Sequence, residues 1–452
     1  MSPHTPNRSS HMFDRRFLVT LIIPLVIEQL LAVSIGMADT VMVARVGEAA
    51  VSAISLVDAI TVLIVTLFAA FATGGAVVAS QYLGRKDRAS ANTAAGQLLL
   101  LSLAVSTALL IICMPIRARI ISVVFGGIEG EVLALGSTYF LYILASLPFL
   151  ASYNACAALF RSMGNSRVSL YVSVTMNVLN IGGNAYFIYA MHMGVAGAGL
   201  STLLSRIIGA VVMLTLITRE SNIISIRSWH TLKWHGEMVK RILRIGVPNG
   251  IEGSVFQVGK LMVQGFITVF GTAAIAANAI SSSVVSFTNI PGGAIGLASI
   301  TIIGQAVGAR RHDEALYWGK RLLLISYITM TSLCIPGFFL TPTVVGFFNL
   351  SSEANTIAVT VIRTAMIMGA LLWSPSFAVP NFLRAAGDAK YTMTVSMLSM
   401  WLFRVAVSYY LAIILGWGVY GVWIGMYIDW ICRGILFTQR FLRGKWRTKT
   451  LI

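Results

Sequence analysis

The chain has 452 residues, of which 57% are hydrophobic and only 11% are charged, and its mean hydropathy is +0.82. This composition lies outside that of soluble globular proteins and indicates an integral membrane protein with no soluble domain left over. The formal net charge of +17 could point to nucleic acid, so the positions of the basic residues decide how that charge is interpreted.

Twelve apolar runs, each close to the ~20 residues that cross a ~30 Å hydrocarbon layer as a helix, follow one another along the chain. Their centres lie near residues 31, 62, 104, 145, 179, 207, 257, 287, 328, 369, 402 and 429. Runs this long and continuously apolar predict helices, because barrel strands would alternate polar and apolar residues. We therefore predict an all-α polytopic membrane protein with short connecting loops.

The basic residues fall mainly on one side of this predicted topology. With both termini inside, 25 of the 33 Lys and Arg residues lie on cytoplasmic segments, whereas Arg45, Arg117 and Arg119 lie outside. Basic loops are retained on the cytoplasmic side of membranes and contact anionic headgroups. The net charge therefore reflects topology, and we expect membrane lipids but no nucleic acid as partners, with the chain in the plasma membrane, the inner membrane of a bacterium.

An internal repeat organises the sequence. A shift of 224 residues aligns PLVIE (24–28) with PNGIE (248–252) and SQYLGRKDRASA (80–91) with GQAVGARRHDEA (304–315). After a one-residue slip, RSMGNSR (161–167) aligns with RAAGDAK (384–390). Because six helices return the chain to its starting side, the two halves should be related by an axis along the membrane normal and enclose a central cleft.

This repeat predicts the division of the chain. We expect a cytoplasmic N-terminal tail (1–14), an N-lobe (15–218), a linker (219–241), a C-lobe (242–441) and a basic cytoplasmic tail (442–452). The linker is basic and contains Trp229 and Trp234, which is typical of an amphipathic segment at the cytoplasmic interface. A simple connector and a regulatory element both remain open for it.

Acidic residues inside the predicted spans are the strongest functional candidates. A carboxylate in mid-membrane costs roughly 2.5–3.5 kcal/mol on insertion scales, so it normally faces a cavity, an ion path or a partner. Five of the sixteen acids fall in spans, namely Glu28, Asp39, Asp58, Glu252 and Asp429. Asp429 is assigned to a structural ion pair with Arg404 or Arg433.

The first span carries two of these acids on one face. Glu28 and Asp39 are eleven residues apart, which is about 1100° of helical turn and leaves them roughly 20° from alignment. Glu28 has a repeat mate in Glu252, each four residues after a proline. For Glu28 an ion-coupling role and a bond to backbone freed near Pro24 are both open.

Asp39 and Asp58 have no acidic repeat mates, because Val263 and Ser282 stand at the equivalent positions. A residue that is acidic in only one half suggests a function rather than a shared scaffold, so we predict that Asp39 is the main ion-coupling residue. For Asp58, a direct role and a carboxylate held by neighbouring Ser or Thr side chains are equally open.

The predicted helix directions bring further polar residues to the same depth. Asp39 and Asp58 lie about eight and nine residues from the external turn at Gly47, and Asn180 and Asn184 lie about ten and seven residues before the next external loop. All four should sit in the outer half of the N-lobe. We predict that they form the ion-coupling site, with Glu28 as a further candidate.

The second half contains a cation in the equivalent span. Lys260 follows Glu252 by eight residues, some 80° around the helix and ~12 Å along it. It either neutralises a carboxylate of the C-lobe cavity or extends to the interface. We predict a C-lobe cavity that contains Glu252, Lys260 and Asn278.

No motif in the sequence supports an enzyme. There is no phosphate-binding GxxxxGK[ST] loop, no HExxH and no nucleophile with an evident base. We therefore expect no cofactor and infer no obligate protein partner. The 19 Met and 22 Phe residues suit an adaptable apolar cavity for small organic compounds, although most must simply be packing.

Several segments together resemble the multidrug and toxic compound extrusion (MATE) family. They are MADTVMVARVGEAAVSAIS, GGAVVASQYLGRKD, the equivalent loops FRSMGNSR and LRAAGDAK, and the twin GTAAIAANAI, and the resemblance covers about residues 14 to 441. It implies a V-shaped pair of six-helix bundles that exports organic, often cationic, compounds by alternating access in exchange for Na⁺ or H⁺.

The resemblance also implies roles for individual residues. Asp39 matches the family's first-helix acid, to which cation or proton coupling is assigned, and Asn180 matches the Asn of the fifth-helix pattern N-x-x-x-D. A Na⁺ site would then include Asp39 and Asn180. This sequence has Asn184 where many relatives carry Asp, so a mechanism with two titrating acids in this lobe requires Asp58 as the substitute.

In the C-lobe the sequence departs again. One branch of the family carries an acid in helix seven, whereas Glu252 stands about one turn closer to the proline, and Lys260 nearby would repel a Na⁺ ion.

Two alternative functions are also open to this chain. A lipid-linked oligosaccharide flippase would need several cleft cations, for which only Lys260, Arg404 and Arg206 could serve. A passive channel is disfavoured by the asymmetric acids and the absence of a selectivity ring.

Overall fold

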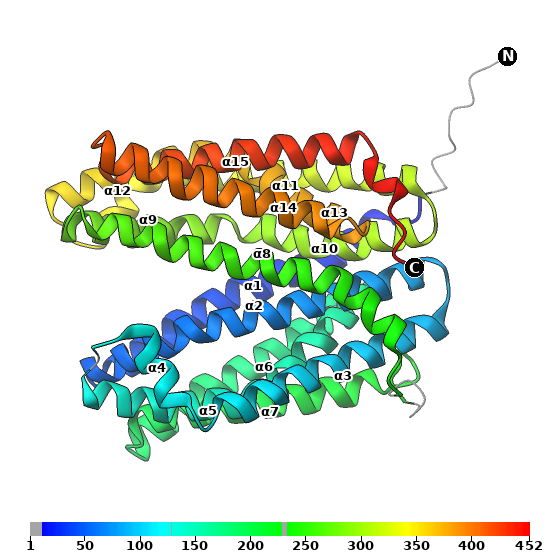
Figure 1. Ribbon diagram of the computed structural model, residues 1–452, viewed down its shortest axis with the longest axis horizontal. Coiled ribbons are helices and arrows are strands. Elements are labelled where there is room, and N and C mark those ends of the chain that lie inside the picture. Colours follow the sequence, from blue (N-terminus) through cyan, green and yellow to red (C-terminus); the bar gives the residue numbers. More distant parts are fainter. Residues whose placement is uncertain (1–10, 128, 228–232) are drawn as a thin grey trace.

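The structure is a computed structural model that describes residues 11–127, 129–227 and 233–452, with the backbone but not the side chains of 35–41. Within these ranges all regular elements are helices, which confirms the predicted fold class. Figure 1 shows two bundles that lie together at one end and diverge towards the other, in the shape of a V. We call the converging end, which carries Arg85, Arg310 and Arg440, the basic end.

The N-lobe consists of the first half of the chain. Its helices are α1 (Arg15–Ala44), α2 (Glu48–Gly84), α3 (Arg88–Cys113), α4 (Arg117–Phe125), α5 (Gly130–Ser162), α6 (Ser166–Asn184), the π-helical η1 (Ala185–Ala190) and α7 (Gly194–Ile217). The short α4 lies at the end opposite to the basic end (Figure 1) and had not been predicted. The remaining helices correspond to the six predicted spans.

The C-lobe repeats this plan with more interruptions. Its helices are α8 (Gly236–Thr268), α9 (Thr272–Thr288), α10 (Ile290–Gly308), α11 (His312–Gly346), α12 (Ser352–Met368), η3 (Gly369–Ala378), α13 (Val379–Ala385), α14 (Ala389–Ser399), η4 (Met400–Val407), η5 (Tyr410–Ile414), α15 (Gly418–Leu442) and η6 (Lys445–Thr448). α8 begins six residues before the boundary expected at 242. The span centred near 287 is divided into α9 and α10 because Pro291 has no N–H to continue the hydrogen-bond ladder.

The outer faces of both lobes are apolar. Exposed side chains include Ile111 of α3, Phe339 of α11 and Ile435 of α15, which are 66%, 72% and 61% accessible. Nine described helices, or runs of adjoining helices, are long and apolar enough to cross a bilayer on their own. Because this much contiguous apolar surface would aggregate in water, the chain is a multi-pass membrane protein.

The two lobes exchange contacts at the basic end. Leu21 and Leu25 of α1 pack in one core cluster with Ala294 and Ile295 of α10. In the equivalent contact of the repeat, Phe71 of α2 packs in a cluster that contains Ile242 and Ile245 of α8. The first helix of each lobe thus packs against the second membrane segment of the other lobe.

Two pairs of repeat-equivalent residues lie at this contact between the lobes, which we call the seam. A Cβ atom at Gly84 would overlap the backbone oxygen of Gln305, and one at Gly308 would overlap that of Gln81. The glutamine side chains cross between the lobes as well, because Gln81 donates to Ala385 O at 2.8 Å and Gln305 donates to Ser162 O at 2.8 Å. Glycine is needed here because only hydrogen at Cα allows the two backbones to approach so closely.

The segment after α15 also crosses the seam. Trp446 is fully buried and stacks on Phe441 with 5.6 Å between ring centroids. Leu451 then enters the core cluster of the N-lobe, and Arg85 donates to the backbone oxygen of Ile452 at 2.9 Å. The predicted basic tail is therefore packed against both lobes.

Candidate functional site

The N-lobe contains a cavity of about 430 Å³ between α1, α2, α5, α6 and α7. Three of the predicted ion-coupling residues line it: Asp58 from α2, and Asn180 and Asn184 from α6. The Asp58 side chain is exposed to the cavity, whereas both asparagines are buried. These three residues therefore lie together at one cavity, as residues predicted to share one depth of the lobe can. The side chain of Asp39 lies outside the described residues.

Hydrogen bonds fix the two asparagines. Asn180 Nδ2 donates to Thr202 Oγ1 at 3.2 Å, and Asn184 Nδ2 approaches Asn180 Oδ1 at 3.4 Å. Ser201 Oγ donates to the backbone oxygen of Asn180 at 2.7 Å, which ties α7 to α6 at this depth. Thr202 of the neighbouring helix therefore holds the Asn180 amide at the cavity wall, and Asn180 in turn contacts the Asn184 amide.

One charged residue of this cavity was not among the predicted site residues. Arg206 of α7 lines it and donates to Ser146 Oγ of α5 at 2.7 Å. In the sequence it stands out only as a cation that a flippase could use. A single Arg in an otherwise apolar span is the signal that could have identified it, because such residues normally face a cavity or partner.

Glu28 lies nearer to the basic end and does not line the N-lobe cavity among the described residues. Its Oε2 accepts a hydrogen bond from Ser169 Oγ at 2.9 Å, and its Oε1 is 3.7 Å from Arg161 Nη1. Glu28 is buried, and Arg161 belongs to the C-terminal end of α5. Through these contacts Glu28 links α1 to α5 and α6.

The C-lobe contains a second cavity, of about 280 Å³. Of the residues predicted for it, Lys260 of α8 and Asn278 of α9 line it, and the Lys260 side chain is exposed to it. Asn278 is held between Gln264 Oε1, to which it donates at 3.0 Å, and Trp423 Nε1, which donates to it at 3.1 Å. Five aromatic side chains form part of the remaining wall, together with aliphatic and polar residues: Phe256, Trp373, Phe377, Trp423 and Trp430.

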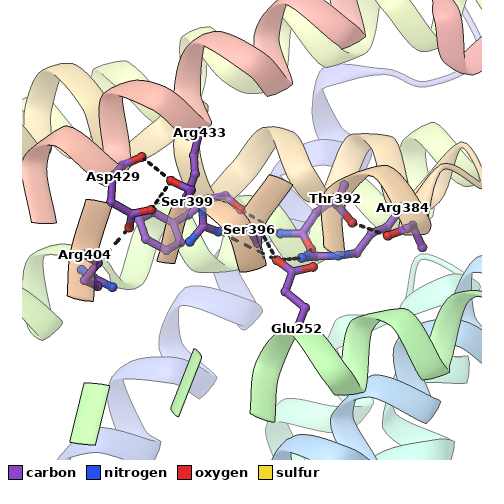
Figure 2. Close-up of polar contacts among 11 residues, drawn as sticks. Glu252, Arg384, Thr392, Ser396, Ser399, Arg404, Asp429 and Arg433 are labelled. Atoms are coloured by element: carbon purple, nitrogen blue, oxygen red, sulfur yellow. Dashed lines mark hydrogen bonds and ion pairs between the residues drawn. The ribbon is translucent and has the colours of Figure 1, made fainter. Parts of the chain in front are cut away.

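Glu252 is not among the residues that line the described C-lobe cavity. It lies in a buried ion-pair network between α8, α13, α14 and α15 (Figure 2). Its Oε1 is 2.7 Å from Arg384 Nη2 and 3.9 Å from Arg433 Nη2, and it accepts a hydrogen bond from Ser396 Oγ at 2.6 Å. The partners of Glu252 resemble those of Glu28, because Arg384 is the repeat mate of Arg161.

Asp429 occupies a second part of this network. It is fully buried, its Oδ2 is 3.8 Å from Arg404 Nε, and Ser399 Oγ donates to Oδ1 (Figure 2). Arg433 lies between the two acids, with its guanidinium 4.7 Å from the ring centroid of Phe377. The expected pair of Asp429 with Arg404 is thus present, and Arg404 also lines the C-lobe cavity.

The two cavities are equivalent positions of the internal repeat. Nine pairs of lining residues are separated by the same 224 residues that relate the two halves. They are Ala32 and Phe256, Val43 and Ile267, Ile54 and Asn278, Asp58 and Ser282, Tyr153 and Phe377, Asn180 and Arg404, Ala198 and Val422, Thr202 and Met426, and Arg206 and Trp430. The same cavity therefore occurs once in each lobe, and the residues that line it differ in charge and polarity between the lobes.

Among the described residues that line the two cavities, Asp58 of the N-lobe is the one carboxylate. Asp58 supplies a carboxylate, and Asn180 and Asn184 supply amide oxygens, which are the hard oxygen donors that Na⁺ or a proton would use. Among the described residues, no group of three or more His, Cys, Asp or Glu residues could hold a metal ion. The C-lobe cavity presents Lys260 and Arg404 instead, so a cation would be repelled there.

Comparison with known proteins agrees with the repeat. The sequence profile of the MatE family matches residues 24–186 and again 248–410, an offset of 224 residues. The chain is 28% identical over 454 residues to the uncharacterized transporter YisQ of Bacillus subtilis, with 96% of each chain covered. It is 25% identical over 446 residues to the probable multidrug resistance protein NorM of Thermotoga maritima, with 97% of this chain and 94% of that one covered.

Solved structures share the whole fold. A MATE crystal structure in complex with MaL6 superposes with a TM-score of 0.89 at 21% identity, covering 96% of this chain and 97% of that one. An outward-facing multidrug resistance MATE transporter superposes with a TM-score of 0.88 at 20% identity, covering 95% and 96%. Because the family profile matches both halves of the repeat and together covers most of the chain, this protein belongs to the MatE family.

Proposed function

We propose that the protein is a secondary active multidrug exporter, which moves organic compounds, often cationic, out of the cell in antiport with H⁺ or Na⁺. The single observation that carries the proposal is the N-lobe cavity, where Asp58 from α2 meets Asn180 and Asn184 from α6 inside a membrane-embedded bundle. A carboxylate in that position marks an ion path, because it is costly to keep unless it is neutralised or solvated.

The arrangement of the lobes supports alternating access. The seam at the basic end is closed by backbone-to-backbone contacts at Gly84 and Gly308, whereas the bundles diverge at the other end (Figure 1). Closure of the diverging end and opening of the seam would expose the two cavities to the opposite side. Such a rigid-body movement about repeat-related helices is the usual route by which secondary transporters alternate access.

Within this cycle Asp39 and Asp58 carry the coupling. Protonation or Na⁺ binding neutralises the N-lobe acids and favours the state that releases substrate, and loss of the proton or ion resets the site, since a ligand shifts the equilibrium by its differential affinity for the two states. One charge that crosses 100 mV provides ~2.3 kcal/mol, and each tenfold concentration step of substrate costs ~1.4 kcal/mol. One ion is therefore enough for a moderate gradient.

The same proposal orients the chain. The basic end faces the cytoplasm of a plasma membrane, the bacterial inner membrane, with both termini inside, because Lys and Arg concentrate in its loops. The names of the curated relatives favour multidrug export over a lipid-linked oligosaccharide flippase. Small organic compounds and membrane lipids are its proposed partners.

The test is efflux of a fluorescent organic cation from proteoliposomes in which a pH gradient and a Na⁺ gradient are imposed separately. We expect transport to follow one of the two gradients. Transport that depends on neither would refute the antiport. In the same assay, an Asp39→Asn variant should lose gradient-driven efflux, and wild-type efflux by that variant would remove Asp39 from the mechanism.

A further inference from the structure

We infer that the C-lobe cavity binds aromatic organic anions, with the acid group of the compound facing Lys260 and its ring against the tryptophan-lined wall. The inference rests on the proposed function, because it names a class of compound that the exporter carries. An anion differs from the organic cations expected for the family, and three features of the C-lobe favour it.

The first feature is the position of Lys260. It lies eight residues before the end of α8 at Thr268, ~12 Å along the helix, and its side chain is exposed to the cavity. Within the described chain its ammonium forms no salt bridge, and the charged neighbour that acts on it is the Arg404 guanidinium. An ammonium in a membrane span is costly unless an anion or water compensates it.

The second feature is the charge balance around the cavity. Four cations lie in this part of the C-lobe, Lys260, Arg384, Arg404 and Arg433, and they face two carboxylates, Glu252 and Asp429. Both carboxylates are already engaged, since Glu252 pairs with Arg384 at 2.7 Å and Asp429 with Arg404. The described wall of the cavity therefore includes Arg404, whose charge Asp429 offsets, and Lys260, for which no paired acid is found among the described residues. The excess of positive charge in this part of the C-lobe attracts negative charge.

The third feature is the aromatic wall. Trp373 and Phe377 stack with 5.1 Å between their ring centroids, and Phe377 meets Trp430 edge-on at 5.8 Å. Trp423 is oriented by its hydrogen bond to Asn278. Rings held in fixed orientations provide flat surfaces on which a planar aromatic compound stacks at little loss of side-chain entropy.

The equivalent N-lobe cavity shows that this chemistry is particular to the C-lobe. Where the C-lobe has Ser282, Arg404 and Trp430, the N-lobe has Asp58, Asn180 and Arg206. An aromatic anion would meet the Asp58 carboxylate in the N-lobe and would find fewer rings there. The cavity volume of about 280 Å³ is near the lower limit of small-molecule sites, which favours a compact aromatic acid over a bulky lipid-linked pyrophosphate.

The experiment compares two radiolabelled compounds that share a naphthalene ring and carry opposite charge, 2-naphthoate and 2-naphthylmethylammonium. Binding to the purified full chain in detergent is measured by equilibrium dialysis. We expect naphthoate to bind about tenfold more tightly than the amine. Lys260→Met should remove this preference, a change of about 1.4 kcal/mol, whereas Lys260→Arg should keep it.

The control is Lys390→Met, which removes an exposed lysine at the start of α14 and should leave naphthoate binding unchanged. Equal or tighter binding of the amine by the wild type would overturn the inference. So would unchanged naphthoate affinity in a Lys260→Met variant that elutes as a folded monodisperse species. Competition of naphthoate by a polyprenyl pyrophosphate at lower concentration would also overturn it, in favour of a lipid-linked ligand.

Transport separates this inference from the proposed function. If proteoliposomes export a fluorescent cation along an imposed gradient while naphthoate shows no Lys260-dependent binding, the inference fails and the antiport stands. If naphthoate binding depends on Lys260 but no compound follows either gradient, the anion site stands and the antiport fails. Gradient-driven export of naphthoate that Lys260→Met slows by about tenfold would support both.

Discussion

The two halves of this chain have the same architecture but different cavity chemistry. The pairs Glu28 with Arg161 and Glu252 with Arg384 recur in both lobes and hold the first helix of each lobe in place. The cavity walls, in contrast, differ at repeat-equivalent positions, with Asp58 in the N-lobe replaced by Ser282 in the C-lobe. We therefore propose that the residues preserved in both halves are structural and that those that differ define what each cavity binds.

The largest effect on stability should come from breaking the ion pair with the shorter distance, Glu252 with Arg384. Glu252→Gln leaves Arg384 and Arg433 buried without their carboxylate, which should lower the free energy of unfolding by about 3–5 kcal/mol. Glu28→Gln should cost about 1–2 kcal/mol, because its guanidinium partner is at 3.7 Å rather than 2.7 Å. Thermal unfolding in detergent, followed by size-exclusion chromatography, measures both.

A Glu252→Gln, Arg384→Met double variant provides the control for this comparison. It should regain part of the loss, since removal of both partners leaves less uncompensated charge. Equal destabilisation by Glu28→Gln and Glu252→Gln would show that the two pairs contribute alike, contrary to their geometries.

The next largest effect should be on transport, and it should differ between equivalent substitutions in the two cavities. Asp58→Asn keeps the volume of the side chain but cannot ionise, so gradient-driven efflux of an organic cation should fall about 100-fold, which corresponds to ~2.7 kcal/mol. The matched control is Ser282→Asn at the repeat-equivalent position of the C-lobe, which should change efflux less than about threefold. Initial rates in proteoliposomes test the pair. Wild-type rates in the Asp58 variant would assign coupling to another residue.

A third change tests the seam that the two lobes share. Gly308→Ala places a methyl group against the backbone oxygen of Gln81, which cannot move aside as a flexible side chain would. We expect a penalty of about 1–3 kcal/mol on the closed seam. A cysteine introduced at the buried Ser80 position should then react several-fold faster with a maleimide.

Gly293→Ala is the control for the seam, because a Cβ at that position meets no atom within 4 Å. Gly84→Ala, at the repeat-equivalent position, should act like Gly308→Ala. Unchanged labelling in both seam variants would mean that the lobes tolerate a wider separation without opening.

The smallest effect concerns helix capping at the basic end. Asp87 caps α3 by accepting a hydrogen bond from Ser90 N at 3.0 Å, and hydrogen bonds from Ser90 hold the pKa of Asp87 below its usual value. Asp87→Ala should cost about 1 kcal/mol. At the equivalent position of the other lobe, the Arg311 side chain does not cap α11 but donates to Glu314 Oε1 at 3.2 Å. Arg311→Ser removes this exposed ion pair and introduces a residue that caps helices well, so it should cost less.

The contribution of Asp87 should depend on pH in a defined direction. Because its pKa is lower in the folded protein than in the unfolded chain, its stabilisation is complete above the unfolded-state value and is lost as the pH falls through the folded-state value. Unfolding midpoints of the wild type and Asp87→Ala should therefore converge only in strong acid. A difference that persists unchanged there would show that the Asp87 carboxylate charge is not what stabilises the cap.

Much of the fold could be predicted from local properties of the sequence. The length of each apolar run predicts a membrane helix, because this property depends only on neighbouring residues in the chain. The 224-residue offset predicts two bundles, because the repeat is found by comparing the residues of the two halves directly. The grouping of Asp58, Asn180 and Asn184 could also be predicted, since helix direction and distance from a loop determine depth. The position of Glu252 outside the C-lobe cavity could not, because depth does not specify which way a side chain faces.

What the sequence alone determined was therefore the class of protein, the repeat and the depth of the polar residues. Tertiary structure decided the partners. It brought Arg384 and Arg433 to Glu252, and it placed Arg206 and Arg404 at the walls of equivalent cavities. The physical reason is that burial of an apolar run depends on its own length, whereas the environment of a charge inside a bundle depends on which helices are packed beside it.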